Sequence, residues 1–344
     1  MKGLKKVSVI IVNWNGERVL RGCLDAIYAQ EYKNIEVIVV DNNSHDNSVE
    51  LIKKNYKHVK LVESDTNLGF AGGNNKGLKY VNGDFILLLN SDAIVTMNFL
   101  QPLVDKLQSE KEVGVVQPLI LYTNNTLHKR GDINSAGTYF LKTGFLYYFG
   151  YGKDSDNRKY QKSDFIFTAY GACMLIKKEI IDAIGLFDVD FFMYFEETDF
   201  CIRSLLSGWK ILYVPESKVY HVGGIAARSY GNSRIYFHSY KNRIASYIKN
   251  FELKTLFLTF PVHLLLCEGI AFIYLCTGKF LYFLAVEKAF LWNMRELGST
   301  LRKRREIQEN YRKISDDQYL PGLTRYPKLS YYIYLLRGLQ YYKE

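Results

Sequence analysis

The chain has 344 residues, of which 48% are hydrophobic and 23% charged, a composition that excludes global disorder and allows one large domain with an appendage, or two domains. The net charge is +10. Most of the positive excess lies in residues 241–344, which contain 17 lysine and arginine residues but only 9 aspartate and glutamate residues. Five cysteines without a C-x-x-C pair give neither a disulfide framework nor a zinc pattern, which favours a reducing compartment.

Short apolar runs alternate with helical patterns through the first half of the chain. The runs are β-branched or leucine-rich and nearly continuous, as parallel strands covered on both faces should be. They occupy residues 7–12, 35–40, 59–62 and 85–89, and apolar residues at helical spacing occupy residues 17–30, 48–57 and 71–81. This alternation predicts an α/β domain with an open, mostly parallel central sheet flanked by helices.

Small polar residues or glycine follow each of the four predicted strands. Ligands bind outside the carboxyl ends of the strands in such sheets, so these residues are candidates for a binding site. Each group alone is also typical of a turn, but four groups at one edge of a sheet favour a site. The residues are Asn13 after the first strand, Asp41 and Asn43 after the second, Gly72 and Asn74 after the third, and Asn90, Ser91 and Asp92 after the fourth.

Two aspartates in these groups indicate specific chemistry. Asp92 ends the fourth strand and can bind Mg²⁺ or Mn²⁺ through oxygen ligands, and such a metal would neutralise a diphosphate. Asp41 can accept hydrogen bonds from a nucleobase or a ribose hydroxyl. A turn or a helix N-cap is the structural alternative for both aspartates.

An acidic cluster and a histidine stand out in the middle of the chain. Residues 196–199 read Glu-Glu-Thr-Asp at the start of a predicted helix, and Glu197 or Asp199 is a candidate base for an acceptor hydroxyl. The alternative is a solvated helix start with acids at the positive end of the dipole. His221 follows short strands expected near residues 211 and 219, and it can complete a metal site or have a structural role. Residues 113–170 give no element order.

The composition changes after residue 240, which predicts a domain covering residues 1–240 and a helical tail covering residues 241–344. Residues 253–267 and 269–286 are strongly apolar, but Glu268 separates them. The favoured interpretation is a pair of interfacial or re-entrant helices followed by a basic segment at residues 302–305, which suits an anionic membrane surface. A spanning hairpin, a buried helical subdomain and a dimer interface are the alternatives. Nucleic acid is not an expected partner, because the tail is too apolar.

Taken together, the motifs resemble those of the family 2 glycosyltransferases with the GT-A fold, especially the rhamnosyltransferase-like members. The resemblance covers roughly residues 6–225. The motifs that carry it are VSVIIVNWNG at 7–16, VVDNNS at 39–44, NLGFAGGNNKG at 67–77, LLNSD at 88–92, and GLFD at 185–188 followed by YFEETD at 194–199 and His221.

The resemblance implies a Rossmann-like GT-A domain and a role for each candidate residue. Asp41 would bind the base or ribose of a nucleotide, with Asn13 and Asn43 lining the same pocket. Asn90-Ser91-Asp92 corresponds to the family's D-x-D motif, so Asp92 and His221 would bind Mg²⁺ or Mn²⁺. Glu197 takes the position of the general base, where the family usually has Asp, and Asp199 remains a competitor for that role.

The implied reaction is an inverting transfer of a sugar from a UDP-sugar or a dTDP-rhamnose-like donor. The acceptor would be a hydroxyl of a glycan or a polyprenyl-linked glycan in cell-surface polysaccharide synthesis. The tail would place the enzyme on the cytoplasmic face of the cell membrane, and a homodimer is compatible with the sequence. The competing hypotheses are a sugar nucleotidyltransferase and a non-catalytic glycan-binding or scaffold protein.

Overall fold

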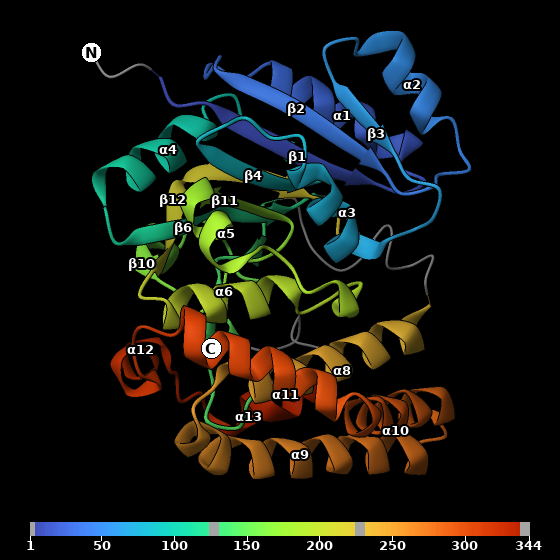
Figure 1. Ribbon diagram of the computed structural model, residues 1–344, viewed down its shortest axis with the longest axis vertical. Coiled ribbons are helices and arrows are strands. Elements are labelled where there is room, and N and C mark those ends of the chain that lie inside the picture. Colours follow the sequence, from blue (N-terminus) through green and yellow to red (C-terminus); the bar gives the residue numbers. More distant parts are fainter. Residues whose placement is uncertain (1–3, 124–130, 224–230, 338–344) are drawn as a thin grey trace.

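A ten-stranded mixed sheet forms the centre of the computed structural model, which describes residues 4–123, 131–223 and 231–337 (Figure 1). Its strands lie in the order β10-β12-β6-β11-β4-β1-β2-β3. The four predicted strands are confirmed as β1 (Val7–Asn13), β2 (Ile35–Asp41), β3 (Lys60–Glu63) and β4 (Phe85–Asn90), and they pair in parallel.

The other half of the sheet contains the antiparallel pairs. Strand β11 (Cys173–Lys177) runs antiparallel between β4 and β6 (Val113–Tyr122), and β12 (Lys210–His221) pairs in parallel with β6. The two short strands expected near residues 211 and 219 are one strand, β12, whose register shifts between Val214 and Lys218. The smaller strands are β5 (Ala93–Val95), β7 (Ile133–Ser135) and β10 (Asp164–Phe165), and β8 (Thr138–Phe140) pairs with β9 (Leu146–Tyr148) in a separate sheet.

Helices cover both faces of the sheet because alternate strand residues are apolar on both sides. Val9 and Ile11 point into a core beneath α1 (Glu17–Tyr28), α2 (Ser48–Asn55) and α4 (Leu100–Ser109). Ile10 points into a second core on the opposite face, which includes residues of α3 (Gly69–Leu78), α5 (Lys178–Ile184) and α6 (Glu196–Leu206). The three helices predicted in the first half are therefore confirmed as α1, α2 and α3.

The C-terminal part is helical and packs against the sheet domain through α8 (Figure 1). Helix α8 lies between α6 and the helices α9 and α10, which lie side by side at the end of the molecule away from the sheet. The predicted boundary between residues 240 and 241 falls inside α8, so the chain has no break there. The helices are α8 (Asn232–Asn250), α9 (Leu253–Cys276), α10 (Phe280–Arg295), α11 (Leu297–Glu306), α12 (Asp316–Leu323) and α13 (Leu329–Arg337), with short turns η1 (Arg158–Tyr160), η2 (Val189–Phe191) and η3 (Ile307–Tyr311).

Helix α9 is apolar all round, and its exposed side carries the large side chains. A narrow stripe of small or polar residues faces the protein, namely Thr255, Thr259, His263, Cys267 and Ala271. Phe257, Leu258 and Leu265 have exposed fractions of 79%, 69% and 73%. The break between the two apolar segments was expected at Glu268, but α9 continues through that residue. The chain instead turns at Gly278, which has a left-handed φ of 71°. Among the described residues α9 is the one helix long and apolar enough to cross a membrane.

Candidate functional site

A cavity of about 230 Å³ lies at the sheet edge where β1 and β4 end. Strand β12 ends at the same place with His221, and β11 begins there because it runs antiparallel to β4. Of the predicted residues, Asn90, Ser91, Asp92, Glu197 and His221 line this cavity. The topology thus brings together residues that are more than 100 positions apart in the sequence.

Asp92 and His221 form a pair on the wall of the cavity. The Nε2 atom of His221 lies 3.1 Å from Oδ1 of Asp92, and the backbone N–H of Gly223 donates to Oδ2 of Asp92 at 3.2 Å. Burial raises the pKa of the Asp92 carboxyl, but the His221 side chain and these hydrogen bonds outweigh it and hold the pKa below its ordinary value. Asp92 is therefore ionised at neutral pH.

His221 is held on its other side by Asn134 of β7, at a distance of 2.9 Å between Nδ1 and the amide Oδ1. An amide oxygen only accepts hydrogen bonds, so Nδ1 carries the proton. The amide nitrogen of Asn90 lies 3.2 Å from Nε2. A proton on Nε2 stabilises its contact with the Asp92 carboxylate. When that proton is lost, the lone pairs of both groups converge, as ligands of a divalent cation do.

The donor set around this pair is small. The part of the chain that the structure describes contains no group of three or more His, Cys, Asp or Glu residues placed to hold a metal. Mg²⁺ and Mn²⁺ in nucleotide enzymes commonly take one or two protein ligands and complete their shell with phosphate oxygens and water. One carboxylate and one imidazole therefore fit a metal that arrives with a diphosphate.

Two adjacent glutamates at the start of α6 line the same cavity. Burial raises the pKa of the Glu197 carboxyl to about 7, although nearby backbone N–H groups work in the opposite direction. Glu196 is 4% exposed, and its Oε2 atom has no hydrogen-bond partner. Burial and the neighbouring Glu197 raise the pKa of Glu196 well above its ordinary value. The pair therefore supplies one carboxyl that exchanges a proton near neutrality, beside a more deeply buried carboxyl whose pKa is also raised.

The loop before α6 is strained where it meets the cavity. Phe192, Tyr194 and Phe195 have positive φ values of 61°, 65° and 71°, which such side chains rarely adopt. Asn242 of α8 stabilises this loop because its Nδ2 group donates to the carbonyls of Phe191, Met193 and Tyr194, at 2.9, 2.9 and 2.6 Å. The C-terminal helices thus help to shape the site.

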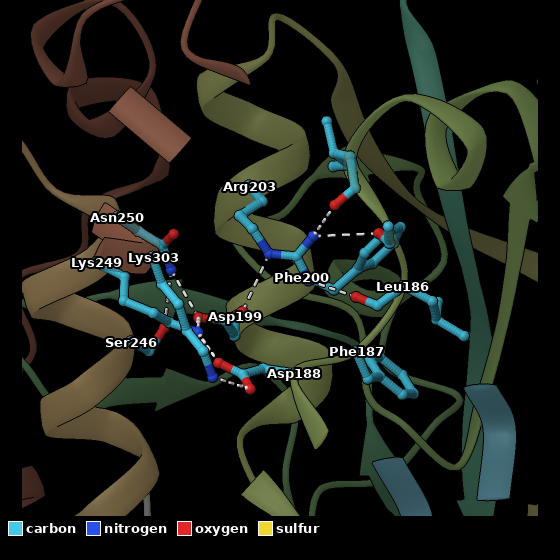
Figure 2. A network of polar contacts seen from close by, with 12 residues as sticks. Leu186, Phe187, Asp188, Asp199, Phe200, Arg203, Ser246, Lys249, Asn250 and Lys303 are labelled. Carbon is cyan, nitrogen blue, oxygen red and sulfur yellow. Dashed lines mark hydrogen bonds and ion pairs between the residues drawn. The ribbon is translucent and has the colours of Figure 1, made fainter. Parts of the chain in front are cut away.

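Asp199 is completely buried and does not line the cavity; it belongs to a network of polar contacts with Arg203, Lys249 and Asn250 (Figure 2). It accepts hydrogen bonds from Arg203 at 3.1 Å and Asn250 at 2.8 Å, and it lies 3.2 Å from the ammonium group of Lys249. These contacts join α6 to α8. An aspartate with this many partners and no access to the cavity holds the two helices together.

The predicted nucleotide residues on β1 and β2 lie beside the cavity. Asp41 accepts hydrogen bonds from the Asn13 amide at 2.9 Å and from the Ser44 hydroxyl at 2.6 Å, and both Asp41 and Asn13 are buried. Asn43 follows in the left-handed region with φ of 62°. Asp41 and Asn13 therefore hold the turn after β2, while the neighbouring Trp14 and Asn42 reach the cavity wall.

Gly72 and Asn74 lie within α3 and do not line the cavity. Asn74 is buried and donates to the carbonyl of Phe70 at 2.9 Å. The residue of the glycine-rich loop that needs its glycine at the site is Gly69. It has φ of 69°, and a Cβ there would lie 2.3 Å from the carbonyl oxygen of Phe192. This loop packs against the strained segment before α6.

Sequence reasoning missed several residues of the cavity wall. Tyr170 and Gly171 precede β11, and they reach the edge because this strand is antiparallel. Within the sheet the prediction took residues that follow strands, and that rule holds for parallel strands alone. The others are Val12, Val19 and Ala172.

Comparison with known proteins bears on this arrangement. The profile of glycosyl transferase family 2 matches residues 8–185, slightly more than half of the chain. The chain is 29% identical over 206 residues to the low-salt glycan biosynthesis hexosyltransferase Agl10 of Haloferax volcanii, covering 58% of this chain and 62% of the relative. It is 33% identical over 96 residues to the UDP-Glc:alpha-D-GlcNAc-diphosphoundecaprenol beta-1,3-glucosyltransferase WfgD of Escherichia coli, covering 28% of this chain and 38% of the relative. The chain thus spans less than two thirds of either relative.

A solved structure agrees with the predicted fold. GalNAc-T7, crystallised with UDP, GalNAc and Mn²⁺, superposes with a TM-score of 0.57 at 18% identity and covers 72% of this chain and 48% of the other. At this identity the likeness shows the fold alone, which is the predicted GT-A fold.

Proposed function

The chain belongs to glycosyl transferase family 2, and we propose that it moves a sugar from a nucleotide diphosphate-sugar to a hydroxyl of a glycan or a lipid-linked glycan, with inversion at the anomeric carbon. The observation that carries the proposal is that Asp92, His221 and Glu197 line one cavity at the carboxyl edge of the sheet. This arrangement places a candidate diphosphate–metal site and a candidate base beside a single reacting centre.

The donor would be a UDP-sugar or a dTDP-sugar such as a rhamnose nucleotide. The UDP and Mn²⁺ in GalNAc-T7 support a nucleotide donor for this fold. Asn90 and Ser91 line the cavity beside Asp92, where they can donate hydrogen bonds to the donor. Asp41, Asn13 and Asn43 shape the adjacent turn and would contact the nucleoside.

Asp92 and His221 would hold Mg²⁺ or Mn²⁺, which would stabilise the negative charge of the leaving diphosphate. Asn134 keeps the His221 ring in the orientation and tautomer that leave Nε2 available. These three residues belong to β7, β12 and the end of β4, so the rigid sheet fixes their positions.

Glu197 would act as the general base. Its carboxylate accepts the proton of the acceptor hydroxyl while the hydroxyl oxygen forms a bond to the anomeric carbon. The bond from that carbon to the diphosphate breaks on the opposite side, so a single displacement inverts the centre. Since Asp199 is enclosed by Arg203, Lys249 and Asn250, the geometry favours Glu197 over Asp199 for this role.

A membrane surface is part of the proposal because of α9 and its neighbours. The large apolar side chains of α9 point away from the protein, and they would meet lipid on the cytoplasmic face of the membrane. WfgD is named for a lipid-linked diphosphoundecaprenol acceptor, which supports an acceptor of this kind here. Agl10 is named for glycan biosynthesis, which supports a role in making cell-surface glycans.

The test is calorimetric titration of the full chain with UDP and dTDP, with and without Mn²⁺, for the wild type and Asp92→Ala. We expect binding of one nucleotide to depend on Mn²⁺ and to be lost in the variant. No binding of either nucleotide to folded wild-type protein would overturn the proposal.

Release of nucleoside diphosphate when a glycan acceptor is added would separate a transferase from a non-catalytic homologue, and pyrophosphate release would indicate a nucleotidyltransferase.

A further inference from the structure

A second cavity, of about 360 Å³, lies between the beginning of α8 and the middle of α10. One face of each helix lines it, since the contributing residues recur at helical spacing. Helix α8 contributes Ser233, Arg234, Phe237 and His238, and α10 contributes Leu281, Leu284, Ala285 and Lys288. The wall therefore combines two cations with a set of apolar side chains.

The two cations of this wall have no acidic partners. Arg234 and Lys288 are both exposed, and neither forms an ion pair with any residue that the structure describes. Lys249 and Lys303 of the same helical region, by contrast, pair with Asp188. Two unpaired cations lining one cavity favour an anionic ligand with more than one charge.

This second cavity is adjacent to the catalytic cavity. The ring of His238 stacks on the ring of Phe192, with centroids 5.4 Å apart, and Phe192 lines the catalytic cavity. Burial and the nearby Lys241 lower the pKa of His238 to about 4, so its ring is neutral. The Nδ1 atom of His238 is buried and has no hydrogen-bond partner.

The apolar part of the wall leads to the exposed apolar surface. Leu281 lines the cavity and is 66% exposed, and the preceding Phe280 is 54% exposed. Helix α9, whose outward side chains are also apolar, packs beside α10 (Figure 1). A hydrocarbon chain that leaves the cavity past Leu281 would thus meet the surface proposed to face lipid.

We propose that this cavity binds the diphosphate and the first hydrocarbon units of a lipid-linked acceptor. The inference rests on the proposed function and adds to it a place for the acceptor. Arg234 and Lys288 would bind the diphosphate oxygens, and Phe237, Leu281 and Leu284 would contact the lipid. The attached sugar would pass the Phe192–His238 pair to reach Glu197.

The test is binding of farnesyl diphosphate to the full chain, measured by calorimetry in the presence of saturating UDP and Mn²⁺ so that the donor site is filled. We expect the double variant Arg234→Gln/Lys288→Gln to bind at least ten-fold more weakly. The matched control is Lys279→Gln/Arg302→Gln, which removes two exposed cations outside the cavity and should change the affinity less than two-fold. UDP affinity should be unchanged in both.

Two further measurements distinguish a lipid-linked diphosphate from a free one: titration with inorganic pyrophosphate, and titration of the Leu281→Ser variant. Pyrophosphate should bind more weakly than farnesyl diphosphate, and Leu281→Ser should weaken only the farnesyl compound. Equal binding of the two compounds, or equal loss in the control variant, would overturn the inference while intact UDP binding leaves the proposed function standing. Failure of both UDP and dTDP to bind the wild type would count against the proposed function. Loss of farnesyl diphosphate binding in the double variant, measured without nucleotide, would still support this inference.

Discussion

Asn134 and His221 are joined by a contact of 2.9 Å between the amide oxygen and Nδ1, although they are 87 positions apart in the sequence. The contact fixes the imidazole tautomer in which Nε2 faces Asp92. A residue outside the family motifs thus determines which nitrogen of His221 is available.

Replacing Asn134 by Ala should therefore weaken metal binding more than nucleotide binding. Partners behind a metal-binding histidine commonly change metal affinity by about 10–100-fold, and we expect a loss of Mn²⁺ affinity in that range. Calorimetry in the presence of UDP measures it, and ¹⁵N spectra of labelled histidine report the tautomer. The surface variant Asn55→Ala serves as the control. Unchanged Mn²⁺ affinity with an unchanged tautomer would show that Asn134 has no positioning role.

The substitution Glu197→Gln tests the base. General-base catalysis contributes roughly 10²–10⁴-fold, so kcat should fall by about that factor while UDP affinity stays within two-fold. The variant keeps the shape and burial of the side chain. A Glu197→Gln enzyme with near-normal kcat would transfer the role to another residue and contradict the assignment.

The pH dependence of turnover follows from the raised pKa of Glu197. A base works in its deprotonated form, so activity should rise with pH and level off above a midpoint at about 7. This midpoint lies well above the ordinary glutamate value because burial disfavours the charged form. Initial rates across pH 5.5–9 measure the profile, and a plateau already reached at pH 5.5 would contradict the raised pKa.

The sheet edge was predictable because it depends on local patterns. Four apolar runs with polar residues after them indicated β1 to β4, and their parallel pairing gathered Asn90, Ser91 and Asp92 at the site. Glu197 stood out as part of an acidic cluster and His221 as a lone histidine after a strand. The family resemblance gave each a role, and both line the cavity.

The remaining parts of the site depend on contacts that local patterns do not reveal. Asn134 belongs to a three-residue strand within the region that gave no element order, and Tyr170 precedes an antiparallel strand. Asp199 matched the family motif as well as Glu197 did. Its separation from the cavity follows from α8, whose Lys249 and Asn250 enclose it. Only the tertiary packing of the C-terminal helices distinguishes the two acids.

Glu196 should make the stability of the protein depend on pH in an unusual direction. Its pKa is raised in the folded state, so folding retains a proton that the unfolded chain releases above about pH 4.3. The free energy of unfolding should therefore fall as pH rises above that value, by at most about 1.4 kcal/mol per pH unit, until the folded-state pKa is reached. Glu196→Gln lacks this titration, so its advantage in Tm over the wild type should grow from pH 5 to pH 8. The exposed variant Glu31→Gln should show no such trend, and a constant difference for Glu196→Gln would contradict the raised pKa.

Lys249 of α8 contacts Asp188 at the start of η2 and the buried Asp199 of α6, and its removal should destabilise the fold (Figure 2). Its ammonium group lies 2.6 Å from Asp188 and 3.2 Å from Asp199, and its side chain is only 3% exposed. Lys249→Met fills a similar volume but leaves Asp199 with Arg203 as its one remaining cation. Removing one partner of a buried ion pair costs about 3–5 kcal/mol where the remaining charge has no compensation. Here Asp199 keeps Arg203 and Asp188 keeps Lys303, so we expect a loss of about 3 kcal/mol or less. Urea denaturation should show a loss of this size. Lys254→Met removes an exposed pair with Asp317 and should leave the midpoint unchanged.

Because Asp199 holds α6 to α8 and Glu197 lies in the first turn of α6, a stable Lys249→Met protein with normal kcat would show that the tail does not position the catalytic helix.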